Sequence, residues 1–299
     1  MNSFVLTWEI DGNSKEMSIK DFLAAREISK RALTDIKFSG GRIEVNGQEE
    51  NVRYLLKRGD RLTVIFPPEI PSSGLLGEDI PLDIVYEDNH VLVINKPPGI
   101  NTIPSRDRPD GSIANAVLGY YKQKMIDATI HIVTRLDRDT SGLLLIAKHR
   151  YCHHLLSKRQ KTNQLTRTYL AVAEGKICPE KGVIDAPIGR KPTSIIEREV
   201  NEQGKRAVTH YEVIRLLPSH SLVELKLETG RTHQIRVHLS HIGHPLAGDD
   251  LYGGSTELIK RQALHCVKLE FYHPILDEKL IFTAELPKDM KQLAKADFE

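Results

Sequence analysis

Charged side chains gather at the edge of an apolar run in the stretch TRLDRDTSGLLLIAKH, residues 134–149. Two carboxylates and several basic groups accompany the apolar residues 143–147, which are typical of a buried strand. Thr140, Ser141 and Gly142 predict the turn that leads into this strand. An ordinary surface loop does not need such charges beside a core, so the stretch indicates a site. The rest of the chain must show which chemistry Asp137 and its neighbours perform.

Two later segments also place a reactive or hydrogen-bonding side chain beside glycine at the end of an apolar run. Tyr169 lies in RTYLAVAEG, and Arg231 lies in LETGRTHQIRVHLSHIGHP. The three segments are therefore candidates for one site.

The elements that would position these residues are mainly strands. From residue 82 onward, alternating or continuous apolar runs predict strands in segments such as HVLVINKPPG, TYLAVAEG, AVTHYEVIRLL and SLVELKLETG. Helices are expected around residues 113–125 and 149–160. The chain has no strict alternation of strands and helices and no Gly-x-Gly-x-x-Gly. We predict an α+β fold with a largely antiparallel sheet.

A small module precedes this domain. The segments SIKDFLAARE and SKRALTDIKFSGG predict two short helices, and RIEVNGQEE and GDRLTVIF predict a small sheet with an Asn-Gly turn. We place the module at residues 1–68 and the larger domain at residues 81–299. Residues 69–80, which are rich in proline, glycine and serine, form the expected linker.

The N-terminal segment, roughly residues 17–66, resembles the S4 RNA-binding module. In that module two helices and the following turn present basic side chains to RNA phosphates. The resemblance implies RNA contacts from Arg26, Lys30, Arg31 and Arg42. A small helical cap with ordinary surface lysines is the alternative interpretation.

Composition excludes several classes of protein. The 299 residues are 40% hydrophobic and 27% charged, and no apolar run reaches the roughly 18 residues that a membrane span needs. The N-terminus carries acids where a signal peptide carries a basic start, so we expect a cytoplasmic protein without a membrane partner. Cys152, Cys178 and Cys266 form no Cys-x-x-Cys, which argues against a structural zinc site and a disulfide framework.

The three candidate segments, taken with further motifs, resemble the RluA/RluD family of pseudouridine synthases. The further motifs are NKPPG, APIGRKP, GKRAVTHYEV, GHPLAGDDLYGG and ALHCVKLEFYHP, and the resemblance runs from about residue 82 to residue 284. It implies the pseudouridine synthase fold, with a largely antiparallel mixed sheet. It also implies an isomerase, an intramolecular transferase that converts uridine in RNA to its C5-linked isomer without a metal or other cofactor.

The resemblance gives each candidate residue a role. Asp137 corresponds to the catalytic aspartate of the family, and Arg231 would supply the cation that keeps it ionised. At about 4 Å and an effective dielectric constant near 20, that attraction is on the order of 4 kcal/mol before desolvation. Tyr169 corresponds to the active-site tyrosine, which stacks on uracil and helps to remove the C5 proton. Stacking is the firmer role, because an unperturbed phenol is a poor base at neutral pH.

RNA contacts are expected around this centre. A uridine in folded RNA must be flipped out of its stack, and Arg135 corresponds to the family's arginine that fills the gap. Arg138, Arg190 and Lys205 are further candidates for RNA contact. Residues 140–173 contain no acid but six basic residues, so we interpret the stretch from Lys148 to Arg167 as a surface that tracks RNA phosphates. A solvated helix face is the alternative.

Two positions depart from the common family pattern. Thr134 stands where many members have histidine before the Arg-Leu-Asp triplet, and NTIPS replaces the usual His-Pro after the NKPxG motif. Neither change affects a catalytic position. We expect both segments to lie near the RNA, which puts a transfer of substrate identity in doubt.

Three other interpretations stay open. His233, His238, His241 and His244 suggest a metal site, although no carboxylate or cysteine completes an obvious ligand set. Asp137 and Asp139 suggest a carboxylate-pair hydrolase, but residues two apart on an extended segment point to opposite faces. A non-catalytic RNA-binding protein is the third, and it has no chemical need for the combined Asp137, Tyr169 and Arg231. We expect a monomer, and the sequence leaves the target RNA open between ribosomal and transfer RNA, with ribosomal RNA favoured.

Overall fold

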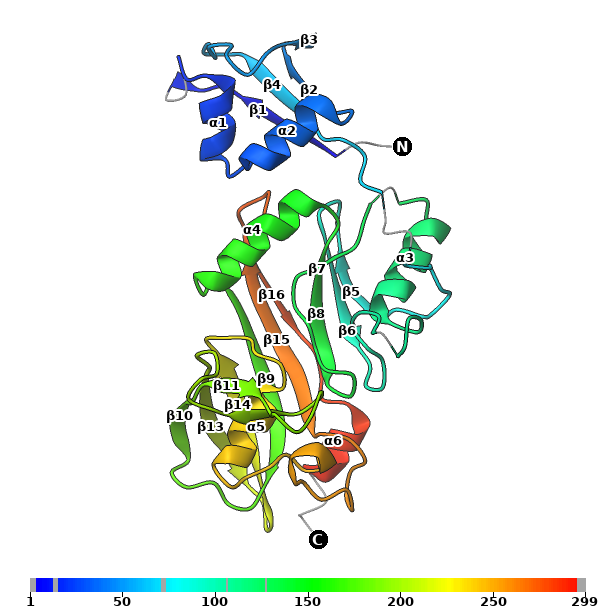
Figure 1. Cartoon of the computed structure of the whole chain (residues 1–299), viewed down its shortest axis with the longest axis vertical. Helices are drawn as coiled ribbons and strands as arrows, with labels where there is room; N and C mark the ends of the chain where they lie inside the picture. The colour runs from blue at the N-terminus through cyan, green and yellow to red at the C-terminus, as the bar shows by residue number, and fades with distance from the viewer. Residues whose placement is uncertain (1–3, 13–15, 71–73, 106, 127, 295–299) are drawn as a thin grey trace.

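The computed structural model describes residues 4–12, 16–70, 74–105, 107–126 and 128–294. The chain forms a small N-terminal module and a larger domain, which are stacked along the long axis of the molecule (Figure 1). Helix α4 (Arg150–Lys161) of the larger domain faces the module. Residues 71–73 of the predicted linker lie outside the described residues. In the described part of the chain no helix is long and apolar enough to cross a membrane.

The N-terminal module is a four-stranded antiparallel sheet with two helices on it. Its elements in chain order are β1 (Val5–Glu9), α1 (Ile19–Ala25), α2 (Lys30–Phe38), β2 (Arg42–Val45), β3 (Gln48–Glu49) and β4 (Arg61–Ile65). The strand order is β1-β4-β2-β3. Ser18 and Ser29 begin the helices by accepting the backbone N–H groups of Asp21 and Ala32. The predicted pair of helices and the turn between β2 and β3 are confirmed, whereas the S4 resemblance itself stays a prediction.

The larger domain is built on a ten-stranded sheet whose central path runs in the order β10-β13-β14-β9-β15-β8-β6-β5. Its first elements are β5 (Ile84–Glu87), β6 (Val91–Lys96), α3 (Ile113–Gln123), β7 (His131–Ile132), β8 (Ser141–Ala147), α4, β9 (Leu165–Glu174), β10 (Lys181–Asp185), β11 (Ile188–Arg190) and β12 (Arg198–Val200). The remaining elements are β13 (Val208–Leu216), β14 (His220–Leu227), α5 (Gln234–His241), a 3-10 turn (Asp250–Tyr252), β15 (Leu264–Tyr272), β16 (Lys279–Thr283) and α6 (Lys288–Leu293).

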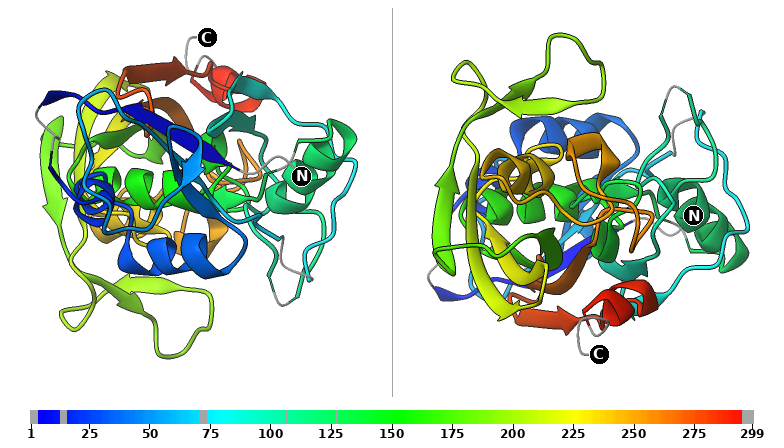
Figure 2. Two further views of the ribbon diagram at one scale, coloured as in Figure 1. Left: turned by 90° about the horizontal axis from the view of Figure 1, so that it is seen from above. Right: turned by 90° about the horizontal axis from the view of Figure 1, so that it is seen from below.

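The predicted fold class is confirmed. Strands β8 and β15 pair in parallel, and the other ladders of the described chain are antiparallel. Strands β11 and β12 form a separate hairpin that projects from the side of the body (Figure 2). The fold is therefore α+β with a mixed, mostly antiparallel sheet.

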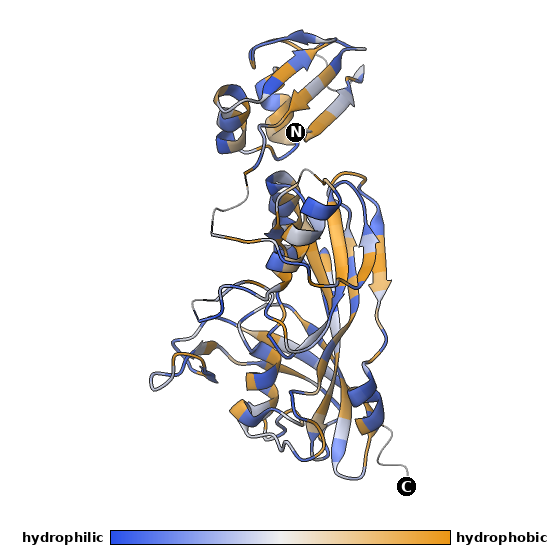
Figure 3. Cartoon of the chain, turned by 90° about the vertical axis from the view of Figure 1, so that its right-hand side faces the viewer, coloured by the Kyte–Doolittle hydropathy of each residue, from blue (hydrophilic) through white to orange (hydrophobic). Residues whose placement is uncertain are grey.

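Strand β8 lies in the middle of the core. It pairs with β6 on one side and β15 on the other, and every residue from Ser141 to Ala147 is buried. Figure 3 shows apolar strands in this part of the large sheet. Gly142 has φ +112°, and a Cβ there would lie 2.4 Å from the carbonyl oxygen of Cys266. A continuous apolar run thus forms a buried strand, and glycine allows β15 to approach it.

Helix α4 joins the two bodies. Tyr151 packs against the core of the N-terminal module, and its hydroxyl donates to the carbonyl oxygen of Arg26 at 2.6 Å. The ring of Phe4 stacks on His149 with the ring centroids 4.0 Å apart. Glu69, at the start of the linker, accepts hydrogen bonds from the Thr129 hydroxyl and the Arg150 backbone N–H. Packing and hydrogen bonds therefore fix the module against the domain.

Acids that are distant in sequence pair with several basic residues around α4, in the stretch predicted to track RNA phosphates. Lys148 is buried and pairs with Glu87 at 2.6 Å. The remaining pairs join Arg150 to Asp35 at 3.3 Å, Lys158 to Glu27 at 3.1 Å and Arg159 to Asp277 at 2.9 Å. These charges mainly hold elements together.

Candidate active site

A cavity of about 650 Å³ lies beside the N-terminal end of β8. Most of its lining comes from residues 101–105 after β6, residues 133–138 before β8, part of β9, and residues 230–236 at the start of α5. Thr140, Gln160, Leu227 and Leu264 complete it. Asp137, Tyr169 and Arg231 all line this cavity. The structure thus brings the three candidate residues together from separate segments, as expected.

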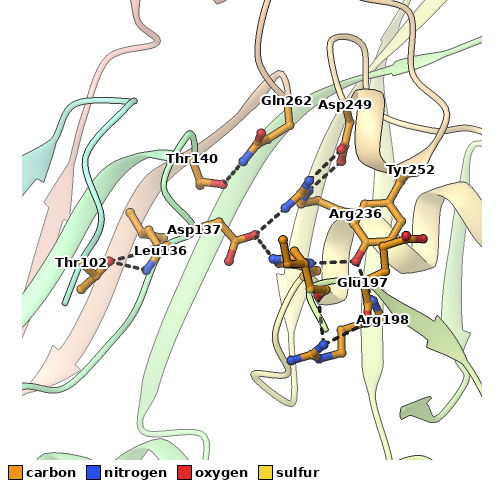
Figure 4. A network of polar contacts seen from close by, with 12 residues as sticks. Thr102, Leu136, Asp137, Thr140, Glu197, Arg198, Arg236, Asp249, Tyr252 and Gln262 are labelled. Carbon is orange, nitrogen blue, oxygen red and sulfur yellow. Dashed lines mark hydrogen bonds and ion pairs between the residues drawn. The ribbon is translucent and has the colours of Figure 1, made fainter. Parts of the chain in front are cut away.

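Hydrogen bonds hold Asp137 in a fixed loop. The carbonyl oxygen of Asp137 accepts from the backbone N–H of Thr140 at 3.2 Å, which closes the turn before β8. The hydroxyl of Thr102 donates to the Leu136 carbonyl oxygen at 2.7 Å and accepts from the Leu136 N–H at 3.2 Å (Figure 4). The turn itself is formed by residues 138 and 139, so the predicted turn at residues 140–142 was placed too late, because Ser141 and Gly142 already pair with β15.

Lys96 supports the same loop from inside the protein. Its side chain is fully buried, and Nζ donates to the carbonyl oxygens of Pro97, Ile100 and Arg138 at 3.0, 2.8 and 2.8 Å. Burial lowers the pKa of Lys96 to about 7, although Asp139 and Asp137 act against this shift. Three carbonyl acceptors match the three hydrogens of an ammonium group. Lys96 therefore ties the NKPPG turn to the residue that follows Asp137.

The cation beside Asp137 is Arg236, and the prediction that Arg231 supplies it was wrong. Arg236 Nη1 lies 3.3 Å from Asp137 Oδ2. Its other edge binds Asp249 through Nε and Nη2 at 2.7 and 2.8 Å, and Asp249 is buried (Figure 4). The side chain of Arg231 is exposed, and its Nε donates to the Arg206 carbonyl oxygen at 2.9 Å. Both arginines line the cavity, but α5 directs Arg236 inward.

Asp249 governs the electrostatics of this group. Burial acts to lower the pKa of Arg236, but the hydrogen bonds and charge of Asp249, together with Asp137, raise it above its usual value. Arg236 thus stays charged. Nε and Nη2 of Arg236 are committed to Asp249, so Arg236 contacts Asp137 through Nη1, which bonds to Oδ2.

His233 is a second neighbour of Asp137. Its Nε2 lies 3.9 Å from Asp137 Oδ2, and its Nδ1 lies 2.7 Å from the hydroxyl of Tyr252. Burial lowers the pKa of His233, although Asp137 acts to raise it. His233 precedes α5 in the left-handed region, with φ 58°, a conformation that costs of order 1–3 kcal/mol for a residue other than glycine. Such strain at the rim of the cavity is typical of a functional position.

Tyr169 of β9 lines the cavity. The residue is buried, and its hydroxyl oxygen accepts a hydrogen bond from Arg167 Nη1 at 3.0 Å. Burial raises the pKa of Tyr169, whereas the charge and hydrogen bond of Arg167 act to lower it. Arg167 is therefore the group that would stabilise negative charge on the phenol oxygen.

Most of the predicted RNA-binding residues of the large domain are exposed around the cavity. Arg135 is exposed at its rim, and Arg190 and Lys205 line a neighbouring cavity to which Arg135 also contributes. Arg138 donates from Nε to the Gly99 carbonyl oxygen at 3.1 Å. Thr134 is buried, and its hydroxyl accepts from the Leu145 N–H at 3.0 Å, so this side chain supports β8.

The predicted RNA-binding residues of the N-terminal module differ in their surroundings. Lys30 and Arg31 are exposed in the first turn of α2. Arg42 is exposed but pairs with Glu44 at 2.6 Å. Arg26 lies over the ring of Phe22 at 4.2 Å, and its Nε is buried without a hydrogen-bond partner in the described chain. Lys30 and Arg31 therefore fit an RNA contact better than Arg26 or Arg42.

Three of the four histidines that suggested a metal, His233, His238 and His244, have protein partners. His238 is buried, with Nδ1 2.8 Å from the Thr209 hydroxyl and Nε2 2.9 Å from the Ala186 carbonyl oxygen. His244 Nδ1 lies 2.8 Å from the carbonyl oxygen of Glu174. Among the described residues no cluster of three or more histidine, cysteine or acidic side chains is arranged to hold a metal ion.

Sequence reasoning missed four residues of the site: Lys96, Arg167, Arg236 and Asp249. A signal for two of them was present. Arg236 lies between apolar residues in QIRVHL, where a buried helix face is expected, and a buried arginine needs an acidic partner. Asp249 follows glycine in the GHPLAGDD motif, and this motif is close to Arg236 in sequence.

Known proteins resemble this chain throughout the region of the site. A family model described as RNA pseudouridylate synthase matches residues 90–241. The chain is 53% identical over 281 residues to the uncharacterized RNA pseudouridine synthase YjbO of Bacillus subtilis, which covers 94% of this chain and 99% of that protein. It is 41% identical over 269 residues to the ribosomal large subunit pseudouridine synthase D of Yersinia pestis, which covers 85% of this chain and 82% of that protein.

A solved structure supports the same assignment. Human RNA Pseudouridylate Synthase Domain Containing 4 matches with a TM-score of 0.57 and 26% identity, over 70% of this chain and 90% of that chain. The residues matched by the family model include the loop of Asp137, the strand of Tyr169 and the helix of Arg236. The chain therefore belongs to the RluA/RluD family of RNA pseudouridine synthases.

Proposed function

We propose that this pseudouridine synthase acts on particular uridines of structured RNA, with ribosomal RNA as the favoured substrate, and that Asp137 begins the reaction. The observation that supports the proposal best is the position of Asp137 at a cavity of about 650 Å³, next to the charged and fixed Arg236. The ribosomal preference rests on relatives that are named for the large ribosomal subunit.

The reaction rearranges the nucleotide without adding or removing atoms overall. Asp137 attacks C1′ of the ribose or the uracil ring, and the bond between C1′ and N1 of uracil breaks. The base turns within the cavity, C5 forms the new bond to C1′, and the C5 proton is lost while N1 gains a proton. Asp137 is released with its electron pair, so the reaction needs no oxidant or reductant.

Arg236 and Asp249 prepare Asp137 for this step. A partly enclosed carboxylate would tend to hold its proton, and a protonated acid is not a nucleophile. Arg236 favours the ionised form, and Asp249 fixes the orientation of Arg236 through two hydrogen bonds. The Asp137 oxygen that Arg236 leaves uncontacted is available to the substrate.

Tyr169 has two roles in this scheme. Its ring lies in the cavity wall, where it can stack on the flipped uracil. Its hydroxyl removes the C5 proton with the help of Arg167, which offsets part of the effect of burial on the pKa of the phenol. Arg135, exposed at the cavity rim, fills the gap that the flipped base leaves.

Other parts of the chain contribute RNA affinity. Arg138, Arg190 and Lys205 contact RNA around the cavity, and the N-terminal module holds a more distant segment through Lys30 and Arg31. The exposed basic residues give a salt-dependent attraction to phosphates. We expect the enzyme to act as a monomer in the cytoplasm.

Tritium release tests the function directly. Bulk RNA labelled with tritium at C5 of uridine is prepared from cells that lack this protein and is incubated with the wild type or with Asp137→Asn. We expect release by the wild type and none by the variant, and mapping of the modified position then identifies the target. If neither protein releases tritium when ribosomal and transfer RNA are both supplied, the catalytic proposal is wrong and a pure RNA-binding role replaces it.

A further inference from the structure

A second cavity of about 430 Å³ adjoins the active-site cavity. The two cavities share Arg135 and residues 230–232, so they lie next to each other at these residues. The strands of the β11–β12 hairpin and the turn at residues 203–205 form the other walls. A strand of RNA that leaves the active site on this side would enter the second cavity directly.

The lining of this cavity is strongly basic. Among the described residues no aspartate or glutamate lines it. Its five cationic side chains are Arg135, Arg190, Arg198, Lys205 and Arg231. Within the described chain the side chains of Arg135, Arg190 and Lys205 have no hydrogen-bond or ion-pair partner. Arg206 lies just outside and pairs with Glu228 at 3.1 Å, so acids are used beside the cavity but not in it.

The hairpin carries an unfavourable pair of like charges. Arg190 of β11 lies directly opposite Arg198 of β12 in the antiparallel register. Like charges in opposite positions destabilise a sheet. Nη1 of Arg198 donates to the carbonyl oxygens of Ile196 and Glu197, both at 2.9 Å, so the hairpin itself holds Arg198. An anion bound at Arg190 would reduce the repulsion between the two guanidinium groups.

The backbone beneath these cations is already fixed. The Lys205 N–H and carbonyl oxygen bond to the carbonyl oxygen and N–H of Ile188 at 2.9 and 3.0 Å. A Cβ on Gly204 would lie 2.4 Å from the carbonyl carbon of Ile188, so this turn needs glycine to approach β11. Arg231 is held by the Arg206 carbonyl oxygen through Nε, which leaves its two terminal nitrogens for a ligand.

We propose that the second cavity binds backbone phosphates of the RNA strand next to the flipped uridine, with Arg190, Lys205 and Arg231 as the phosphate ligands. This inference rests on the proposed function, because it names the part of the substrate that lies outside the active site. It also gives Arg231 a new role. Arg231 binds the substrate backbone, whereas Arg236, and not Arg231 as predicted, is the cation beside Asp137.

Salt titration of RNA binding tests the cavity without any turnover. The probe is a short RNA hairpin with an all-uridine loop, bound to Asp137→Asn protein with and without Arg190→Gln, Lys205→Gln or Arg231→Gln. We expect each added change to weaken binding about tenfold and to reduce the slope of log affinity against log salt by about 0.7. Lys176→Gln, an exposed lysine that lines neither cavity, serves as the control. If all three variants bind as this control does, the cavity is not a phosphate site.

Steady-state kinetics distinguish the role of Arg231 from that of Arg236. They also test the phosphate site separately from the proposed function. With C5-tritiated bulk RNA, Arg231→Gln should raise KM about tenfold with little change in kcat, whereas Arg236→Gln should lower kcat. A loss of kcat at unchanged KM in Arg231→Gln would overturn the phosphate role. Absence of tritium release from the wild type would refute the proposed function alone, since the binding slopes are measured separately.

Discussion

Asp249 binds Arg236 through both oxygens, at 2.7 and 2.8 Å, and so decides which nitrogen of the guanidinium faces the cavity. The contact from Arg236 to Asp137, at 3.3 Å, is longer than either of these bonds. Arg236, which contacts the proposed nucleophile Asp137, is therefore itself held by a buried acid. That acid, Asp249, does not line the cavity.

We expect Asp249→Asn to lower kcat by about 10²-fold, because a displacement of about 1 Å at the reacting groups has an effect of that size. An amide offers Arg236 one acceptor instead of two. The measurement is single-turnover tritium release, with the salt slope of RNA binding as the control for substrate contacts. A variant with full kcat would show that Asp137 does not need this support.

Tyr169→Phe separates stacking from proton removal. We expect RNA affinity to stay the same because the ring is kept, and C5 tritium release to slow by about 10²-fold or more because the oxygen beside Arg167 is lost. Cleavage of the glycosidic bond should continue, so a stalled enzyme–RNA complex should accumulate on denaturing gels. Normal tritium release would leave stacking as the role of this residue.

Thr102→Val removes the two hydrogen bonds that clamp Leu136 while keeping the shape of the side chain. The buried N–H and carbonyl oxygen of Leu136 then lose their partner, which costs about 1–3 kcal/mol for each unsatisfied group. We expect a lower Tm and a lower kcat, since Asp137 follows Leu136 directly. Thr102→Ser keeps the hydroxyl and should restore both, and equal loss in the two variants would contradict the clamp.

The stability of the junction between the N-terminal module and the larger domain should depend on pH through Glu69. Burial acts to raise the pKa of Glu69, but hydrogen bonds from His131, Thr129 and the Arg150 N–H prevail and lower it from 4.5 to about 2. A depressed pKa of an acid means that its stabilisation is present above about pH 4.5 and is lost as the pH falls toward 2.

We therefore expect the thermal stability of the wild type to fall over this acidic range more steeply than that of Glu69→Gln. Trp8 is the single tryptophan and lies in the N-terminal module, so its fluorescence can follow this part of the chain. Parallel curves for the two proteins would show that Glu69 does not contribute to the acid sensitivity.

Sequence patterns predicted the parts of the site that depend on local order. The run from Leu143 to Ala147 is apolar at every position, which identified the buried strand and the loop of Asp137 before it. Arg231 and Arg236 lie in one motif, and the choice between them depends on where α5 begins. His233 adopts a left-handed conformation at that point, and the sequence gives no sign of it.

Charge was harder to interpret than strand pattern. The basic stretch from Lys148 to Arg167 contains no acid, so a reading along the chain leaves its charges unpaired. Its partners lie in the N-terminal module, in β5 and beyond β15, and folding brings them together. Long-range pairing of this kind depends on the tertiary structure, which local patterns do not specify.

During synthesis on the ribosome, the acidic partners of the α4 basic residues emerge at different times. Glu27 and Asp35 leave the ribosome before the helix, so the partners of Lys158 and Arg150 are already present when these residues emerge. Asp277, the partner of Arg159, follows 118 residues later. The side of α4 that holds the N-terminal module can thus be complete while the C-terminal strands of the sheet are still being made.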